Sequence, residues 1–209
     1  PGQEGEADFS LTVKNKEQIP VKTFTDKNFT VRTSATINSD NVPLALKGTR
    51  LKGENQLVIK LNSRPNLKSK IIYYDNLLQN FGPLPPRINQ KTTYTVYWQI
   101  LNLSNDLSGA TVEASLPSYI NWEGNISPAN ENIKYNPATG KIIWNINKLS
   151  SGTGVLLPVK QAAFQIGLTP AVNQIGSTPD LVQNTIISAQ DEFTGLEINA
   201  CGLEFLLGF

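Results

Sequence analysis

Apolar and polar side chains alternate along most of this chain of 209 residues. A period of two is typical of strands that bury one face, whereas an amphipathic helix needs a period near 3.6. The pattern predicts an all-β chain of antiparallel strands packed as a β-sandwich. The clearest alternating runs are residues 94–100, 110–116, 142–146, 162–168 and 196–200.

Turn-forming residues separate these runs. In the segment 135–141, "YNPATGK", Asn-Pro begins a turn and Gly140 is expected to take a positive φ. Pro117 ends the strand before it at Leu116, because proline donates no hydrogen bond to a neighbouring strand. On the apolar faces between such turns we expect four residues to pack in a core: Trp98, Leu116, Trp144 and Phe164.

Trp122 stands apart from the other two tryptophans, because it follows a bend that contains proline. We expect it to be the most exposed of the three. An exposed indole ring is a candidate ligand contact. The alternative to a structural role is therefore an adhesion module that binds a glycan or a host surface through exposed loops and Trp122.

Residues that carry chemistry are scarce. The chain has no His, which removes the commonest general base and metal ligand. Its one Cys, Cys201, can form no internal disulfide. Asp191 and Glu192 are adjacent, so on a strand their carboxylates point to opposite faces rather than flank a cleft. We expect no enzyme activity, no catalytic residues and no cofactor.

Loop oxygens at Asp75, Asn76, Asn105 and Asp106 lack the spacing of a calcium-binding loop, so no metal is expected. Charge is balanced, with 18 basic and 17 acidic residues, and the lysines are scattered; nucleic acid is not an expected partner. No apolar run approaches the roughly 18 residues of a membrane helix, so no span is expected within this sequence.

The longest patterned stretch, "TTYTVYWQILNLSNDLSGATVEASLPSYINW", is followed by "YNPATGKIIWNINKL" and "AAFQIGLTP". Together they resemble the Ig-like repeat domain of large bacterial cell-surface proteins, most closely the versions found in candidate-phylum bacteria. The resemblance covers roughly residues 64–200. It implies a structural module outside the cell, and it supplies no catalytic residues to carry over.

The N-terminal part is different. Alternating runs at residues 9–13, 29–33 and 57–61 predict only about four strands, fewer than the roughly seven of a complete Ig-like sandwich. An incomplete sandwich leaves an apolar face and an unpaired strand edge. Pro65 is expected to stiffen a joint near residues 62–70.

The C-terminal tail carries Leu203, Phe205, Leu207 and Phe209 in alternation, as in a strand, and no position for that strand is evident in its own domain. It is either a longer final strand or the start of a further repeat, or else it is a strand donated to the N-terminal domain of another copy. Donation repeated head to tail does not close and generates a fibre.

These observations predict tandem Ig-like sandwiches in an all-β chain. We expect residues 1–63 to form an N-terminal β domain short of strands, residues 64–201 an Ig-like repeat and residues 202–209 the apolar tail. The expected role is that of a non-catalytic structural module of an exported bacterial surface protein, as a stalk or filament subunit. Its expected partners, outside the cell, are other copies of the chain or neighbouring repeats of its parent protein.

Overall fold

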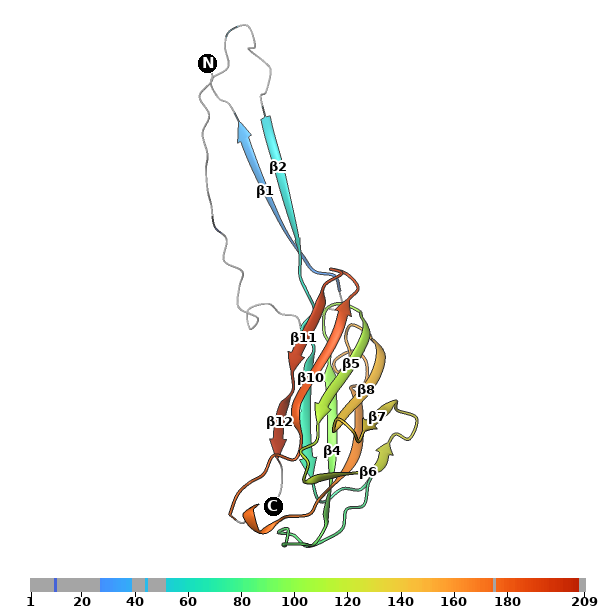
Figure 1. Ribbon diagram of the computed structural model, residues 1–209. Helices are drawn as coiled ribbons and strands as arrows, with labels where there is room; N and C mark the ends of the chain where they lie inside the picture. The colour runs from blue at the N-terminus through green and yellow to red at the C-terminus, as the bar shows by residue number, and fades with distance from the viewer. Residues whose placement is uncertain (1–9, 11–26, 39–43, 45–51, 175, 207–209) are drawn as a thin grey trace.

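The computed structural model describes residues 10, 27–38, 44, 52–174 and 176–206, and these residues are built mainly of β-strands, which confirms the all-β class (Figure 1). A 3-10 turn, η3 (Val172–Gln174), lies between two strands. In chain order the strands are β1 (Thr30–Asn38), β2 (Lys52–Lys60), β3 (Asn66–Ile72), β4 (Thr92–Leu101), β5 (Leu107–Ser115), β6 (Ile120–Ser127), β7 (Ile133–Asn136), β8 (Lys141–Leu149), β9 (Lys160–Leu168), β10 (Gln183–Asp191), β11 (Glu197–Cys201) and β12 (Leu203–Leu206).

Two five-stranded sheets form the sandwich. Their strand orders are β12-β3-β4-β9-β6 and β11-β10-β5-β8-β7. All pairings are antiparallel except that of β12 with β3. One sheet holds β3, β4 and β9, which correspond to strands A, B and E of an Ig-like sandwich. The other sheet holds β5, β10 and β11, which correspond to strands C, F and G. The predicted sandwich is therefore confirmed for this part of the chain.

Aromatic rings from both sheets meet in the core. Trp98 of β4 and Trp144 of β8 stack with ring centroids 6.3 Å apart, and the edge of Phe164 lies 4.7 Å from Trp98. All three are fully buried, and Leu116 is 7% exposed, as the alternation predicted. A loop that precedes β4 covers the other face of this strand. In that loop, Phe81 N donates a 2.8 Å hydrogen bond to Thr93 Oγ1 of β4.

The predicted turn at Gly140 is confirmed, with φ at 68°. Its carbonyl accepts a 2.8 Å hydrogen bond from Leu116 N, which ties the turn to the end of β5. A Cβ at this position would lie 3.0 Å from Leu116 O. Both observations explain why glycine occupies the turn.

Strands β1 and β2 form a separate two-stranded sheet, here called the ribbon. They pair antiparallel over nine residues, from Thr30 opposite Lys60 to Asn38 opposite Lys52. Figure 1 shows the ribbon projecting from one end of the sandwich. Only residues 61–65 connect β2 to β3. Residues 66–70, which were expected to belong to a joint near residues 62–70, are part of β3. The strand expected at residues 9–13 lies outside the described residues, apart from Ser10.

The expectation that the tail has no position in its own domain is wrong for its first part. Leu203–Leu206 form β12, which pairs in parallel with β3 of the same sandwich, Leu206 opposite Ile71. Gly202 lets the chain cross from one sheet to the other, since a Cβ there would lie 3.1 Å from Thr185 Cγ2. The side chains of the four predicted assembly residues, Leu203, Phe205, Leu207 and Phe209, lie outside the described part of the structure.

Candidate functional site

One face of the ribbon carries apolar side chains, which are exposed on β2 and at Ile37 and partly buried at Val31. The register places Val31 opposite Ile59 and Thr33 opposite Leu57 on this face. Exposure reaches 60% for Leu57 and 77% for Ile37, which shares the face. Within the described residues, no further strand pairs with the outer edge of either β1 or β2. The ribbon therefore presents apolar side chains, and no other strand of the described residues pairs with its outer edges.

Buried polar side chains hold the ribbon to the sandwich. We call this cluster the polar joint, and it consists of Ser63, Asn102, Asn105 and Asp191. Ser63 is 3% exposed and the other three are fully buried. Buried polar groups are stable only where they are hydrogen-bonded, so the partners of each group determine what the cluster does.

Asp191, at the end of β10, is the main acceptor of the joint. Its Oδ2 accepts 2.7 Å hydrogen bonds from Ser63 N and from Asn105 Nδ2. Its Oδ1 accepts from Phe193 N at 2.9 Å and Thr194 N at 3.0 Å in the following turn. Burial by itself raises the pKa of Asp191, but these hydrogen bonds outweigh it and the pKa is lowered.

Asn105 connects both chain segments of the ribbon to the sandwich. Its Oδ1 accepts from Asn28 N at 3.2 Å, just before β1, and its Nδ2 donates to Leu61 O at 2.8 Å, just after β2. Asn102 supports it by donating from Nδ2 to Asn105 O at 2.8 Å and by accepting from the Ser63 hydroxyl. The amide of Asn105, considered above as a calcium ligand, is engaged within the protein.

Two lysines make contacts at the solvent-exposed edge of the polar joint. Lys27 Nζ lies 2.6 Å from Asp106 Oδ2, and this hydrogen bond is the largest cause of the lowered pKa of Asp106. Lys60 Nζ donates to Phe193 O at 2.9 Å and lies 4.7 Å from the centre of the Phe193 ring. Exposed pairs of this kind contribute little stability. The buried hydrogen bonds are therefore what fixes the direction of the ribbon.

The lowered pKa of Asp191 gives a prediction about acid. A carboxylate whose folded pKa lies below its ordinary value of 3.8 stabilises the fold above that pH, and the contribution is lost as pH falls through the folded pKa. Asp106 and Asp75 are shifted in the same direction. With no His in the chain, we expect the urea midpoint to stay level from about pH 5 to 8 and to fall below about pH 4.

Urea unfolding at a series of pH values checks this expectation. The Asp191→Asn variant is the comparison, because it lacks this titrating group and should lose part of the acid dependence. A wild-type midpoint that changes steeply between about pH 5 and 7, where an ordinary His would titrate, would contradict the assignment.

Trp122 lies on strand β6 and is partly buried, so it is the most exposed of the three tryptophans, as predicted. Its ring stacks on Tyr135 with centroids 5.6 Å apart, and it lies 5.3 Å from Phe164. The ring thus packs against the outer part of the core. The proposed ligand contact at Trp122 stays a prediction.

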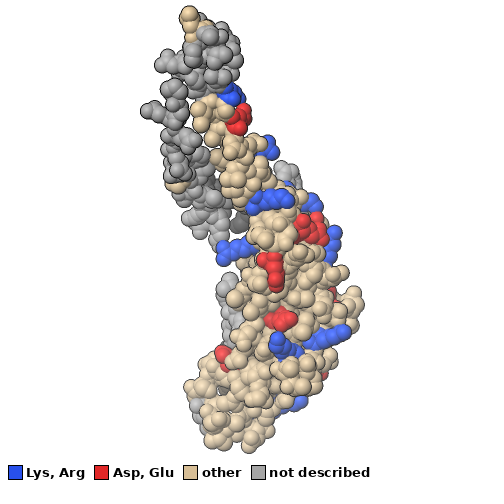
Figure 2. All heavy atoms as spheres, turned by 45° about the horizontal axis from the view of Figure 1, so that its top comes forward, with Lys and Arg blue, Asp and Glu red and all other residues tan. Residues whose placement is uncertain are grey.

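The described residues supply little else that could bind or react. No group of three or more His, Cys, Asp or Glu among them is placed to hold a metal ion, and none of their helices is long and apolar enough to cross a membrane. Cys201 is a free, exposed thiol. Figure 2 shows basic and acidic side chains interspersed over the face in view.

No protein-family model and no curated protein matches the sequence. Similar solved structures include the full-length major pilin SpaD from Corynebacterium diphtheriae, with 12% identity over 96% of this chain and 63% of that chain and a TM-score of 0.44. Another is BcpA, the major pilin subunit of Bacillus cereus, with 10% identity over 74% and 49% and a TM-score of 0.40. A GH20 exo-β-N-acetylglucosaminidase from Vibrio harveyi shows 10% identity over 68% and 18% and a TM-score of 0.37.

This chain therefore spans less than two thirds of the length of each of these proteins.

Proposed function

We propose that this chain is a non-catalytic structural subunit of an extracellular filament on a bacterial cell surface, joined head to tail by strand donation. The observation that carries the proposal is the apolar face of the ribbon, on which Ile37, Leu57 and Ile59 are 77%, 60% and 48% exposed. The bacterial and extracellular location rests on the sequence resemblance to surface repeats.

An isolated two-stranded ribbon is marginally stable in water. A third strand supplies main-chain hydrogen bonds along an open edge and covers part of the apolar face. Burying one large aliphatic side chain contributes roughly 1.5–3 kcal/mol. Covering side chains as exposed as Leu57 and Ile59 therefore favours association.

Donor and acceptor lie at opposite ends of the sandwich. The ribbon joins the end where β3 and β11 begin, through Ser63 and Asp191. β12 runs parallel to β3 and therefore points toward the other end. Figure 1 shows the same separation. The ribbon of the same chain lies at the other end, whereas the ribbon of a second copy can approach the end toward which β12 points. Such a heterologous contact builds a filament when the rotation between successive copies does not close a ring.

Donation requires the tail to exchange one pairing for another. The pairing of β12 with β3 is parallel and covers only four residues. Parallel pairs are slightly less stable per residue than antiparallel ones. Pairing along the nine-residue ribbon offers a longer edge. The exchange therefore gives up a short contact for a longer one.

Charging the apolar face of the ribbon tests the acceptor. We expect the double variant Leu57→Lys with Ile59→Lys to raise the critical concentration for fibres at least about tenfold, because one lost apolar contact of about 1.4 kcal/mol already corresponds to that factor. Pelleting and electron microscopy measure it. Val58→Lys is the matched control, since Val58 lies between these two residues but on the opposite face, opposite Arg32. Equal effects of the two changes would contradict a face-specific contact.

Mixing two defective chains tests head-to-tail donation directly. The first, the tail copy, carries Leu57→Lys with Ile59→Lys and keeps its tail. The second, the ribbon copy, carries Leu203→Lys with Phe205→Lys and keeps its ribbon. Each alone should stay monomeric, and the mixture should give a heterodimer and nothing larger. Sedimentation measures the mass, and unfolding curves confirm that both chains fold. A mixture that stays monomeric would contradict strand donation, and the remaining role for the chain would be that of a stalk module.

A further inference from the structure

One turn at the ribbon end of the sandwich exposes consecutive apolar side chains. Residues 150–159 connect β8 to β9, and within them Val155, Leu156 and Leu157 are 47%, 57% and 46% exposed. No residue of this connection is charged. A run of exposed apolar residues is unfavourable in water and is retained where it serves a contact. We call Val155, Leu156 and Leu157 the apolar turn.

Main-chain hydrogen bonds order the apolar turn. The carbonyl of Gly152 accepts from the amides of its three residues, at 3.0, 2.8 and 3.0 Å, and Gly154 N donates to Leu157 O at 2.9 Å. Thr153 O accepts from Asn102 N of the polar joint at 2.9 Å, which ties the turn to the sandwich. An ordered turn loses little conformational freedom when it binds, so its side chains can act as anchors in a contact.

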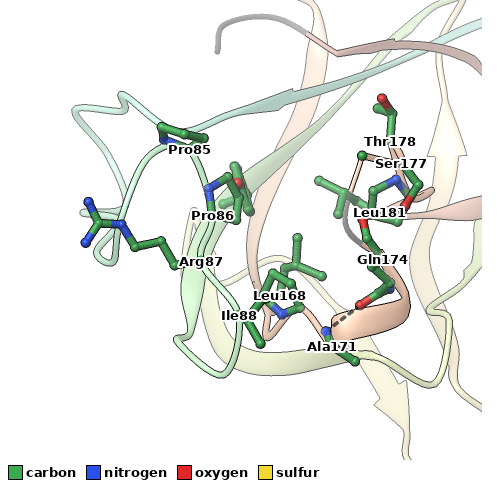
Figure 3. Close-up of a pocket in the computed structure, with 14 residues that line it drawn as sticks. Pro85, Pro86, Arg87, Ile88, Leu168, Ala171, Gln174, Ser177, Thr178 and Leu181 are labelled. Atoms are coloured by element: carbon green, nitrogen blue, oxygen red, sulfur yellow. Dashed lines mark hydrogen bonds between the residues drawn. The ribbon is translucent and has the colours of Figure 1, made fainter.

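A pocket of about 660 Å³ opens at the opposite end of the sandwich. Figure 3 shows its labelled lining residues on two facing segments, with Pro85 and Pro86 on one and Gln174 on the other. We call it the proline pocket, because Pro170 and Pro179 also line it. Proline fixes the backbone angle φ, so these walls are largely formed before anything binds. The volume lies in the range of pockets that enclose a small ligand or an anchoring side chain.

The apolar turn and the proline pocket cannot meet within one chain. The turn is bonded to Asn102, which follows the last residue of β4. The pocket is lined by Tyr94, near the start of β4, and by residues 85–88, which precede this strand. The ten residues of β4 separate the two features by about 30 Å.

We infer that the proline pocket of one copy receives the apolar turn of the next copy. This inference rests on the proposed function, because it adds a second contact to the head-to-tail junction. The apolar turn lies at the same end as the ribbon, and the pocket lies at the end toward which β12 points. A copy whose tail approaches the ribbon therefore brings its pocket toward the apolar turn.

The lengths of the two elements allow both contacts at once. Nine paired residues make a ribbon of about 30 Å, close to the length of β4. The ribbon projects from the sandwich and can lie along the flank of the second copy while the two ends touch (Figure 1). Strand pairing and the pocket contact are then made by different parts of the same junction.

The chemistry of the pocket also favours an apolar occupant. Arg87 is the only charged residue among its described lining residues, and its guanidinium extends away from the pocket in Figure 3. Two of its polar side chains are already engaged, since Gln174 Oε1 accepts from Ala171 N at 2.9 Å and the Ser177 hydroxyl donates to Gln174 O at 2.8 Å. An uncharged turn placed there leaves no charge buried without a partner.

The heterodimer of tail copy and ribbon copy tests each side of the contact separately, because the ribbon copy supplies the apolar turn and the tail copy supplies the pocket. We expect Leu156→Asp in the ribbon copy to raise the dissociation constant at least tenfold, as measured by sedimentation. The same change in the tail copy should alter it less than threefold. Leu196→Asp in the ribbon copy is the matched control, since Leu196 is 56% exposed in a different turn, between β10 and β11, and should also have less than a threefold effect.

Ala171→Trp tests the pocket, because it places an indole at a lining residue. In the tail copy we expect it to raise the dissociation constant at least tenfold, and in the ribbon copy less than threefold. Val172→Trp is the matched control, since Val172 is the next residue, 68% exposed and outside the lining. Urea unfolding of each variant confirms that it folds.

Combining the two changes tests whether turn and pocket touch. Leu156→Asp in the ribbon copy and Ala171→Trp in the tail copy remove the same contact, so together they should weaken binding by less than the product of their separate effects. Effects that multiply in full would overturn a direct contact.

The outcomes separate the two proposals. A heterodimer that forms and ignores both Leu156→Asp and Ala171→Trp would overturn the pocket contact and leave strand donation in place. Equal weakening by either change in both copies would show a general effect on the fold, and would also overturn the pocket contact. Absence of any heterodimer would overturn both proposals.

Discussion

Asp191→Ala is expected to lower the free energy of unfolding by roughly 3–5 kcal/mol, because each buried donor left without an acceptor costs about 1–3 kcal/mol. The change removes the acceptor of Ser63 N, Asn105 Nδ2, Phe193 N and Thr194 N together. Water that enters the joint recovers part of this cost. Urea unfolding of the monomeric ribbon copy measures the change without interference from assembly.

Glu192→Ala is the matched control, because Glu192 is the next residue but its side chain is exposed. A surface change of this kind is expected to alter stability by no more than about 0.5 kcal/mol. Hydrogen exchange adds a second measurement: in Asp191→Ala the amides of β1 and β2 should lose more protection than those of β4 and β9. Uniform loss across the sandwich, or an effect as small as that of Glu192→Ala, would contradict the role given to the joint.

Trp98→Ala is expected to destabilise the sandwich by about 3–5 kcal/mol, the usual cost of removing a large buried aromatic side chain. Trp98 is fully buried between Trp144 and Phe164, at centroid distances of 6.3 Å and 4.7 Å. The cavity left behind lies where the two sheets meet, and rigid strands close it only in part. Thermal and urea unfolding measure the loss.

Two other variants make the test of the core specific. Trp98→Phe keeps an aromatic ring and removes Nε1, which has no hydrogen-bond partner among the described residues, so it should cost less than Trp98→Ala. Trp122→Ala should also cost less, because Trp122 is partly exposed. A larger loss from Trp122→Ala than from Trp98→Ala would place the main packing contact elsewhere.

The polar joint links stability to the proposed assembly. A donated strand transmits load between subunits only when the ribbon is firmly attached to its sandwich. Asn105 contacts the chain on both sides of the ribbon, at Asn28 and Leu61. A weakened joint is therefore expected to give fibres that bend more, even where the ribbon and the tail are intact.

Much of the sandwich follows from local pattern. A period of two identifies strands without knowledge of their partners, and it placed Trp98, Trp144 and Phe164 on buried faces. Turn chemistry located Gly140 and the end of β5 at Leu116-Pro117, since both depend on the backbone preferences of single residues. The exposed apolar face of the ribbon was also foreseeable, from the small number of strands expected in residues 1–63.

Local pattern is thus enough for the all-β class, for the strands near residues 94–100, 110–116, 142–146, 162–168 and 196–200, and for the aromatic core, whereas β3, β6 and β7 were not predicted. Contacts between residues that are far apart in the chain follow only from the tertiary structure. Ser63 and Asp191, whose hydrogen bond helps to build the joint, are 128 residues apart. The tail found a parallel partner in β3, because sheet pairing brings together groups whose alternation specifies a face but not a neighbour.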